Sequence, residues 1–131
     1  WYFFDDSGAM ASGWKQIGGT YYYFNGSGAM QTGWLNTGSA WYYLSGSGAM
    51  ATGWLSLGGT WYWFDASGAM ATGWQTIGGE RYHFDGSGAM ASGWSVIDGS
   101  YYYFDGSGAM QANKWIDGSY VDSDGRWDQN V

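Results

Sequence analysis

The sequence predicts an all-β solenoid of stacked β-hairpin repeats, about 20 residues each. Three observations carry this prediction. The motif Ser-Gly-Ala-Met recurs with a period of 20, which places Met residues at positions 10, 30, 50, 70, 90 and 110. A Gly-Trp pair precedes a Gly-rich dipeptide in most units, and four mostly aromatic residues follow it. Such a short period is typical of repeats that bury their apolar faces only against their neighbours.

Each unit is expected to contain two strands joined by a two-residue turn. The dipeptides expected at the turns are Gly18-Gly19, Gly58-Gly59, Gly78-Gly79 and Asp98-Gly99. They tolerate the positive φ angles of a type I′ turn, whose twist suits a hairpin. The aromatic run after the turn favours a second strand. The Asp-Gly-Ser-Gly-Ala-Met stretch then connects to the next unit, with Asp65, Asp85 and Asp105 expected to form Asx hydrogen bonds. No helix is expected.

The turn dipeptides also predict the strand register. If Gly18-Gly19 is a two-residue loop, Ile17 faces Thr20 and Trp14 faces Tyr23. Because side chains alternate along a strand, Trp14 and Tyr21 share one face as diagonal neighbours. Stacking the hairpins would let Tyr42 of the following unit supply a third ring. We therefore expect three-walled aromatic slots between consecutive hairpins.

Composition limits what can form the core and what the chain can bind. Aliphatic residues are scarce, whereas the 131 residues include 11 Trp, 12 Tyr and 6 Phe. Aromatic rings and Met must therefore supply most of the burial, and the core is predicted at Phe24, Phe64, Phe84 and Phe104. The formal net charge of −7, with four Lys and Arg residues, argues against nucleic acid. No apolar run is long enough for membrane insertion, and the chain opens in mid-motif, as expected of a fragment whose secretion signal would lie upstream.

Three electron-rich rings around a gap suit two classes of ligand. A quaternary ammonium would bind through cation–π attraction and through apolar contact with its methyl groups. The same rings would also serve as stacking platforms for the faces of sugars. The pattern alone leaves both ligand classes open.

The motifs Gly-Trp, Gly-Gly-Thr-Trp-Tyr and Asp-x-Ser-Gly-Ala-Met-Ala-Thr-Gly-Trp resemble the choline-binding, or cell-wall-binding, repeat of Gram-positive bacteria and their phages. The resemblance implies a left-handed β-hairpin superhelix, with tandem repeats over residues 1–112 and a degenerate capping repeat over 113–131. It also implies a secreted, non-catalytic module at the bacterial cell wall or cell surface. Such a module would bind choline or phosphocholine of teichoic acids, without a cofactor, and anchor a larger autolysin, endolysin or adhesin.

The resemblance also implies individual cages, each formed by the Trp of Gly-Trp, the first aromatic of the next strand, a Tyr of the following hairpin and a Met at the floor. The sets are Trp34, Trp41, Tyr62 and Met50; Trp54, Trp61, Tyr82 and Met70; and Trp14, Tyr21, Tyr42 and Met30. Two further interfaces depart from this pattern. In the first, Arg81 stands at the position of the first aromatic residue of the strand, beside Trp74 and Tyr102. In the second, Val121 stands where a Tyr of the following hairpin would complete the cage of Trp94 and Tyr101.

Two other functions compete with choline binding. Arg81 and the Tyr walls at 21 and 101 would fit a glucan or wall-carbohydrate binder, and degenerate sites would fit a structural spacer or a homodimerisation stalk. Catalysis is not expected, because His83 is the only His and holds a strand position that is usually Tyr. No metal site is expected, since the Asp residues at 122, 124 and 128 lack the spacing of an EF-hand.

Overall fold

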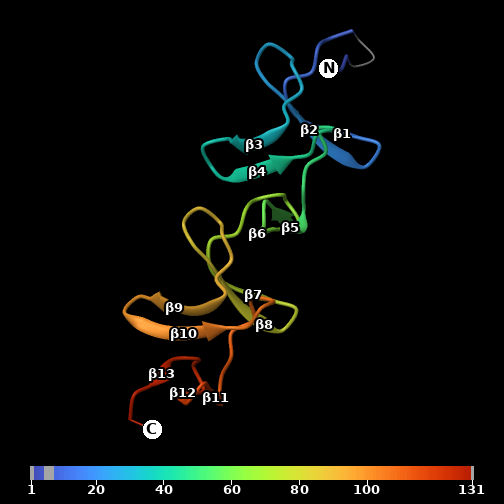
Figure 1. The fold of residues 1–131 in the computed structure, drawn as a ribbon. Helices are drawn as coiled ribbons and strands as arrows, with labels where there is room; N and C mark the ends of the chain where they lie inside the picture. Colours follow the sequence, from blue (N-terminus) through green and yellow to red (C-terminus); the bar gives the residue numbers. More distant parts are fainter. Residues whose placement is uncertain (1, 5–7, 131) are drawn as a thin grey trace. The chain divides into compact units, whose positions relative to one another are not determined.

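The computed structural model describes residues 2–4 and 8–130. Within these ranges the chain forms strands, turns and loops, and no helix, as predicted (Figure 1). The chain divides into two compact units, one made of Trp1–Ser56 and Trp63–Met70, the other of Leu57–Tyr62 and Ala71–Val131. The predicted division into repeats over 1–112 and a cap over 113–131 stays a prediction.

Each unit contains two regular antiparallel hairpins of consecutive strands, and the second unit also contains the C-terminal tail. The first unit has β1 (Gly13–Ile17) with β2 (Thr20–Phe24), and β3 (Gly33–Asn36) with β4 (Trp41–Leu44). The second unit has β7 (Gly73–Ile77) with β8 (Glu80–Phe84), and β9 (Gly93–Ile97) with β10 (Ser100–Phe104). The boundary between the units crosses the repeat with β5 (Gly53–Leu57) and β6 (Thr60–Phe64). The tail is a three-stranded sheet of β11 (Lys114–Ile116), β12 (Ser119–Val121) and β13 (Trp127–Asp128).

The predicted register of the first hairpin is confirmed. Ile17 pairs with Thr20, and Trp14 pairs with Tyr23. Gly18 and Gly19 adopt φ angles of 60° and 85°, the left-handed region that a type I′ turn requires. Asp98 and Gly99 do the same, with φ angles of 51° and 82°. The turn dipeptides therefore fix which ring stands opposite which.

The turn between β3 and β4 differs from the others. The last ladder pair is Asn36 with Trp41, so the loop is longer by two residues than in the first hairpin. Gly38 has a φ of 94°, but Ser39 does not adopt a positive φ, because its Cβ disfavours the left-handed region. The Asn36 side chain supports the loop by accepting a hydrogen bond from the Gly38 amide at 2.8 Å.

The connections between hairpins are closed by Asx hydrogen bonds, as predicted. The Oδ1 atom of Asp65 accepts from the Ser67 amide at 2.9 Å, from the Ser67 hydroxyl at 2.6 Å and from the Ala69 amide at 3.1 Å. Asp85 and Asp105 repeat this pattern. The Ser67 hydroxyl is the main reason why the pKa of Asp65 lies below its ordinary value. Each connection is thus a small rigid loop.

A main-chain hydrogen bond links each of these connections to an earlier hairpin of the same unit. In the first unit, the amide of Met50 donates to the carbonyl of Tyr21 at 2.9 Å, and the amide of Met70 donates to that of Trp41 at 2.8 Å. In the second unit, the amide of Met90 donates to the carbonyl of Trp61 at 3.0 Å. The backbone therefore places each of these Met residues beside the first ring of a strand that begins about thirty residues earlier.

The largest fully buried side chains of the core come from successive repeats and from the tail. The predicted core residues Phe24, Phe64, Phe84 and Phe104 are fully buried, and Leu44 and Val121 are buried with them. The Trp of an earlier repeat packs on this core: the ring centroids of Trp34 and Phe64 lie 6.0 Å apart, and those of Trp74 and Phe104 lie 5.9 Å apart. One face of each Trp is thereby held against the core.

Candidate ligand-binding cages

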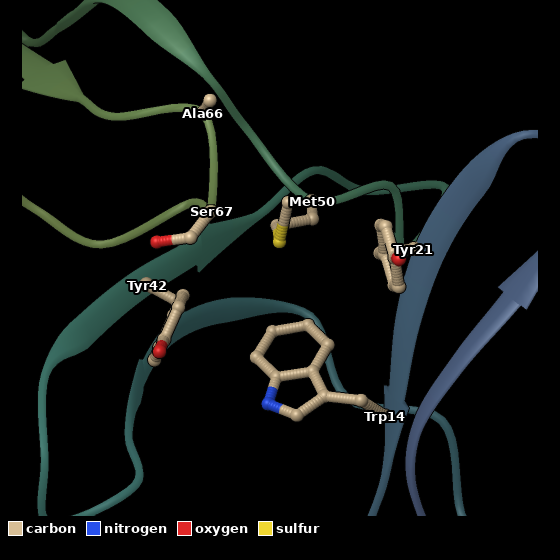
Figure 2. A pocket seen from close by; sticks show the side chains of 6 residues that line it. All are labelled: Trp14, Tyr21, Tyr42, Met50, Ala66 and Ser67. Carbon is tan, nitrogen blue, oxygen red and sulfur yellow. The ribbon is translucent and has the colours of Figure 1, made fainter.

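The first unit contains an aromatic pocket at the predicted position. It is a cavity of about 360 Å³ lined by Trp14, Tyr21, Tyr42, Met50, Ala66 and Ser67. Figure 2 shows the Trp14, Tyr21 and Tyr42 rings around one space, with the Met50 sulfur between Tyr21 and Ser67. Trp14 comes from β1, Tyr21 from β2 and Tyr42 from β4. Two consecutive hairpins therefore supply the three rings that the register argument brought together.

Ring contacts fix the orientation of the Trp14 wall. Its ring meets that of Tyr42 edge to face, with centroids 4.9 Å apart and an interplanar angle of 64°. Tyr23, its partner across the hairpin, packs on it in the same way at 5.0 Å. Tyr21 remains 42% exposed at the mouth of the pocket. Trp14 is thus held from two sides, whereas Tyr21 leaves one side of the pocket open to solvent.

The Met at this pocket comes from a different repeat than the resemblance implied. The predicted set contained Met30, but Met50 lines the cavity. The reason lies in the backbone, because the Met50 amide binds the Tyr21 carbonyl. Met30 and Met50 pack against Gly48 and Gly68 in the same way, so the backbone bond and not this packing sets the difference. The same amide–carbonyl bonds place Met70 beside Trp41 and Met90 beside Trp61, one repeat further on than predicted.

Of the other two predicted cages, one pair of walls lies within a single unit. The rings of Trp34 and Trp41 lie 6.3 Å apart at 83°, close to perpendicular, and form two walls in the first unit. Trp54 and Trp61 are both exposed. Tyr62 and Tyr82 belong to the second unit, whereas Trp34, Trp41 and Trp54 belong to the first. The completion of these two cages therefore stays a prediction.

The fourth interface holds a guanidinium over its Trp. The rings of Trp74 and Tyr102 lie 4.9 Å apart at 70°, nearly the geometry of Trp14 and Tyr42. The Cζ atom of Arg81 lies 4.5 Å from the centroid of the Trp74 ring. This is a cation–π contact. An internal cation thus stands at the face of Trp74.

The fifth interface contains a wall that the sequence reasoning missed. A cavity of about 210 Å³ is lined by Trp94, Tyr101, Ser119 and Trp127. Trp127 meets Tyr101 edge to face, with ring centroids 5.5 Å apart at 87°. Val121, which occupies the expected wall position in the sequence, is fully buried. Trp127 lies outside the 20-residue period, so no repeat-based comparison pointed to it.

His83 is the only His of the chain, and it lies beside the ring of Trp74. His83 packs edge to face on Trp74 with ring centroids 5.0 Å apart, and its burial lowers its pKa. Among the described residues, no group of three or more His, Cys, Asp or Glu side chains could hold a metal ion. The same part of the chain has no helix of the length and apolarity that crossing a membrane requires.

Two models of repeat families match this chain. The model of the choline-binding repeat matches residues 11–52, 32–72 and 71–115, and that of a putative cell wall binding repeat matches residues 1–10. No curated protein sequence matches the chain.

Solved structures with the same fold come from Streptococcus pneumoniae. Choline binding protein F, crystallised in the presence of a peptidoglycan analogue, is 44% identical over 98% of this chain, with a TM-score of 0.96. CbpJ is 42% identical over 96% of it, with a TM-score of 0.90. The chain spans 44% and 47% of the length of these two proteins. The matches confirm the predicted fold class, an all-β array of hairpin repeats, whereas the left-handed sense stays a prediction.

Proposed function

This chain belongs to the choline-binding repeat family, and from that premise we propose that it is a non-catalytic module that holds choline of teichoic acids in aromatic cages. The observation that carries the proposal is the cavity walled by Trp14, Tyr21 and Tyr42. A trimethylammonium group spreads its positive charge over methyl groups, so ring faces attract it while the methyls make apolar contacts. The Met50 thioether offers a soft, polarisable surface to those methyl groups.

The size and charge of the site support the same ligand. A cavity of about 360 Å³ is at the small end of ligand pockets, which suits a head group rather than a large molecule. The net charge of −7 attracts cations to the chain. Each cation–π contact contributes about 0.5–2 kcal/mol. Three such contacts give a total of a few kcal/mol, which corresponds to an affinity for free choline of roughly millimolar order.

We also propose that the module anchors a larger secreted protein at the bacterial cell surface. The chain spans 44% of choline binding protein F and 47% of CbpJ, so a protein of their length would contain more than this module. Several weak cages on one chain would retain it on a wall that displays many choline groups. Weak single sites are therefore compatible with firm anchoring.

The test uses Tyr21→Ala, with Gln16→Ala as the matched control. Gln16 pairs with Tyr21 across the hairpin and does not line the cavity. We expect choline to change the tryptophan fluorescence and raise the melting temperature of the wild type. Tyr21→Ala should weaken binding at this site about tenfold, the loss of about 1.4 kcal/mol. Gln16→Ala should bind as the wild type does.

Two outcomes would overturn the proposal. One is a wild-type chain that shows neither a fluorescence change nor thermal stabilisation at any choline concentration up to the molar range. The other is binding of dextran that excess choline does not displace. The second outcome would favour a glucan-binding module, for which the Tyr hydroxyls of this pocket would serve as hydrogen-bond partners.

A further inference from the structure

The C-terminal tail forms part of an aromatic cavity outside the repeat pattern. Trp94 of β9, Tyr101 of β10 and Trp127 of β13 surround about 210 Å³, with Ser119 of β12 at its edge. The three rings keep 40%, 44% and 37% of their surfaces exposed. A tail that only capped the last repeat would cover these rings, whereas this tail leaves their faces accessible.

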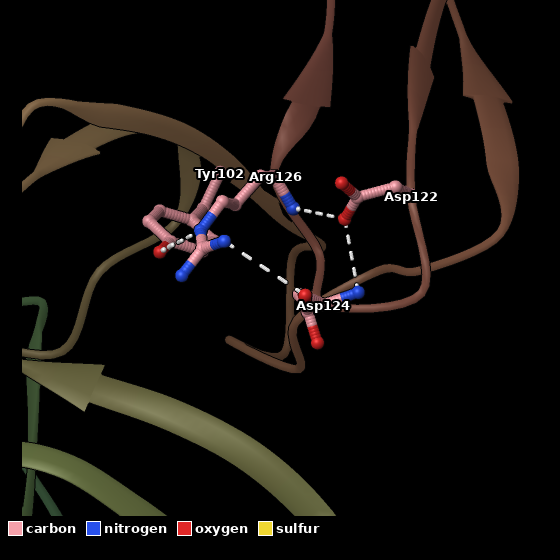
Figure 3. Close-up of polar contacts among 4 residues, drawn as sticks. All are labelled: Tyr102, Asp122, Asp124 and Arg126. Atoms are coloured by element: carbon pink, nitrogen blue, oxygen red, sulfur yellow. Dashed lines mark hydrogen bonds and ion pairs between the residues drawn. The ribbon is translucent and has the colours of Figure 1, made fainter.

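Backbone and side-chain contacts hold Trp127 in place. The preceding residue, Arg126, forms a β-bridge with Tyr102 of β10. Its Nε–H also donates to the Tyr102 hydroxyl at 3.4 Å, and its guanidinium pairs with Asp124 at 3.8 Å (Figure 3). Adjacent residues of an extended chain point to opposite sides. Trp127 therefore points away from Tyr102 and toward Tyr101, with ring centroids 5.5 Å apart.

Hydrogen bonds and one packing contact hold the turn before Arg126. Asp122 accepts hydrogen bonds from the amides of Asp124 at 2.9 Å and of Arg126 at 3.0 Å. Gly125 lies against the side chain of Met110, and a Cβ at this position would collide with the Met110 sulfur. These contacts tie the tail to the last regular repeat. The position of Trp127 is thus set before any ligand arrives.

The lining of the cavity discriminates between the two ligand classes. A sugar presents several hydroxyl groups, each of which loses free energy on burial unless it finds a hydrogen-bond partner. Ser119 is the one lining residue with an aliphatic hydroxyl, and the rest of the lining is Trp94, Tyr101 and Trp127. An organic cation with methyl groups needs ring surface and few hydrogen bonds. The cavity therefore fits the cation better than the sugar.

We propose that Trp94, Tyr101 and Trp127 form an additional cage for a quaternary ammonium group, completed by the tail instead of by a further repeat. The inference rests on the proposed choline-binding function and extends it to a site that the repeat pattern does not contain. It also gives the tail a second role besides ending the array, because removal of β13 would remove one wall of the cage.

Equilibrium dialysis with labelled choline tests the proposal by counting the sites on each chain. We expect Trp127→Ala to have one site fewer than the wild type, and Trp127→Tyr to keep it, since a second aromatic ring restores the wall. Tyr101→Ala removes another wall, the one from β10, leaves the sequence of the tail unchanged and should lose the same site. The double variant Trp127→Ala/Tyr101→Ala should therefore also lack only one site.

Tyr21→Ala separates the failure of this inference from that of the proposed function. At a choline concentration near the wild-type dissociation constant, it should empty most of a different site, so that combining it with Trp127→Ala lowers the count by about two. An unchanged count in both Trp127→Ala and Tyr101→Ala, in a chain that does bind choline, would overturn the additional cage and leave the proposed function standing. A wild-type chain without any bound choline would overturn both.

Discussion

At the residue scale, Arg81 distinguishes the Trp74 interface from the proposed cage at Trp14. Trp74 and Tyr102 have nearly the mutual geometry of Trp14 and Tyr42. The difference is the third wall, where the Arg81 guanidinium lies 4.5 Å from the Trp74 ring centroid. A fixed guanidinium repels a second cation and already has the ring face that the cation would need.

Arg81→Trp should therefore add a choline site. Trp stands at the equivalent repeat positions 41 and 61, so the strand accepts it. We expect the number of bound choline molecules in equilibrium dialysis to rise by one. Arg81→Gln is the control, because it removes the charge without supplying a ring, and it should bind choline at this interface more weakly than Arg81→Trp. An unchanged count in Arg81→Trp would show that the guanidinium does not set the preference.

The repeated Asp residues make the connecting loops sensitive to acid. The Ser67 hydroxyl and nearby amides bind the charged form of Asp65 and lower its pKa, and Asp85 and Asp105 are in the same situation. A carboxyl group whose pKa is lower in the folded state stabilises the fold above its unfolded pKa, which is about 3.9. That stabilisation is lost as the pH falls through the folded pKa.

Replacing Asp65, Asp85 and Asp105 by Asn should move acid unfolding to lower pH. Asn25 supports this prediction, because its Oδ1 accepts the same three hydrogen bonds in the first repeat. We expect the triple variant to keep its fold at neutral pH and to lose less stability between about pH 5 and pH 2 in urea titrations. A loss on acidification as large as in the wild type would show that other carboxyl groups dominate.

At the scale of the repeat, the Gly before Ala-Met is required by both conformation and space. Gly108 has a φ of 89°, and a Cβ there would collide with the sulfur of Met90. Gly106 lies in the same loop without a positive φ, and a Cβ added to it would meet no heavy atom within 4 Å. The two glycines thus form a matched pair within one connection.

Gly108→Ala should lower the free energy of unfolding by about 1–3 kcal/mol, because the left-handed conformation is strained for any residue with a Cβ. Gly106→Ala should change it by less than about 0.5 kcal/mol. Urea denaturation measures both values. Equal effects of the two substitutions would contradict the packing of Met90 against Gly108.

Features of the repeat that depend on residues close together in the sequence could be predicted, whereas features that depend on distant residues could not. The register of β1 and β2 was predicted correctly, because Gly18 and Gly19 fix it locally. The choice of Met50 over Met30 depends on a main-chain bond to Tyr21 about thirty residues away. A pattern with a strict period of 20 cannot show which repeat supplies that bond. Trp127 was missed for a related reason, since the tail leaves the period.

At the scale of the whole molecule, the proposed function depends on the number of cages that act together. Each cage is expected to bind weakly, and retention on a surface grows steeply with the number of linked sites. The acidic composition adds a general attraction for cations, which salt screens. Under the proposed function, the repeat array would convert weak head-group contacts into firm attachment.

Loss of cages should therefore reduce retention more than it reduces affinity for free choline. Tyr21→Ala and Trp41→Ala each remove an exposed wall in the first unit. On a resin that carries trimethylammonium groups, we expect each variant to elute at a lower concentration of free choline, and the double variant to elute much earlier than either. Identical elution of the double variant and the wild type would mean that these walls do not hold the resin ligand.

The most direct measurement for the central claim is a crystal structure of the chain soaked in choline. The account predicts a trimethylammonium group enclosed by Trp14, Tyr21 and Tyr42, with the Met50 side chain in contact. It also predicts no choline over Trp74, where Arg81 lies. An empty Trp14 pocket in a crystal with choline bound at other positions would contradict the claim that these rings form the binding cage.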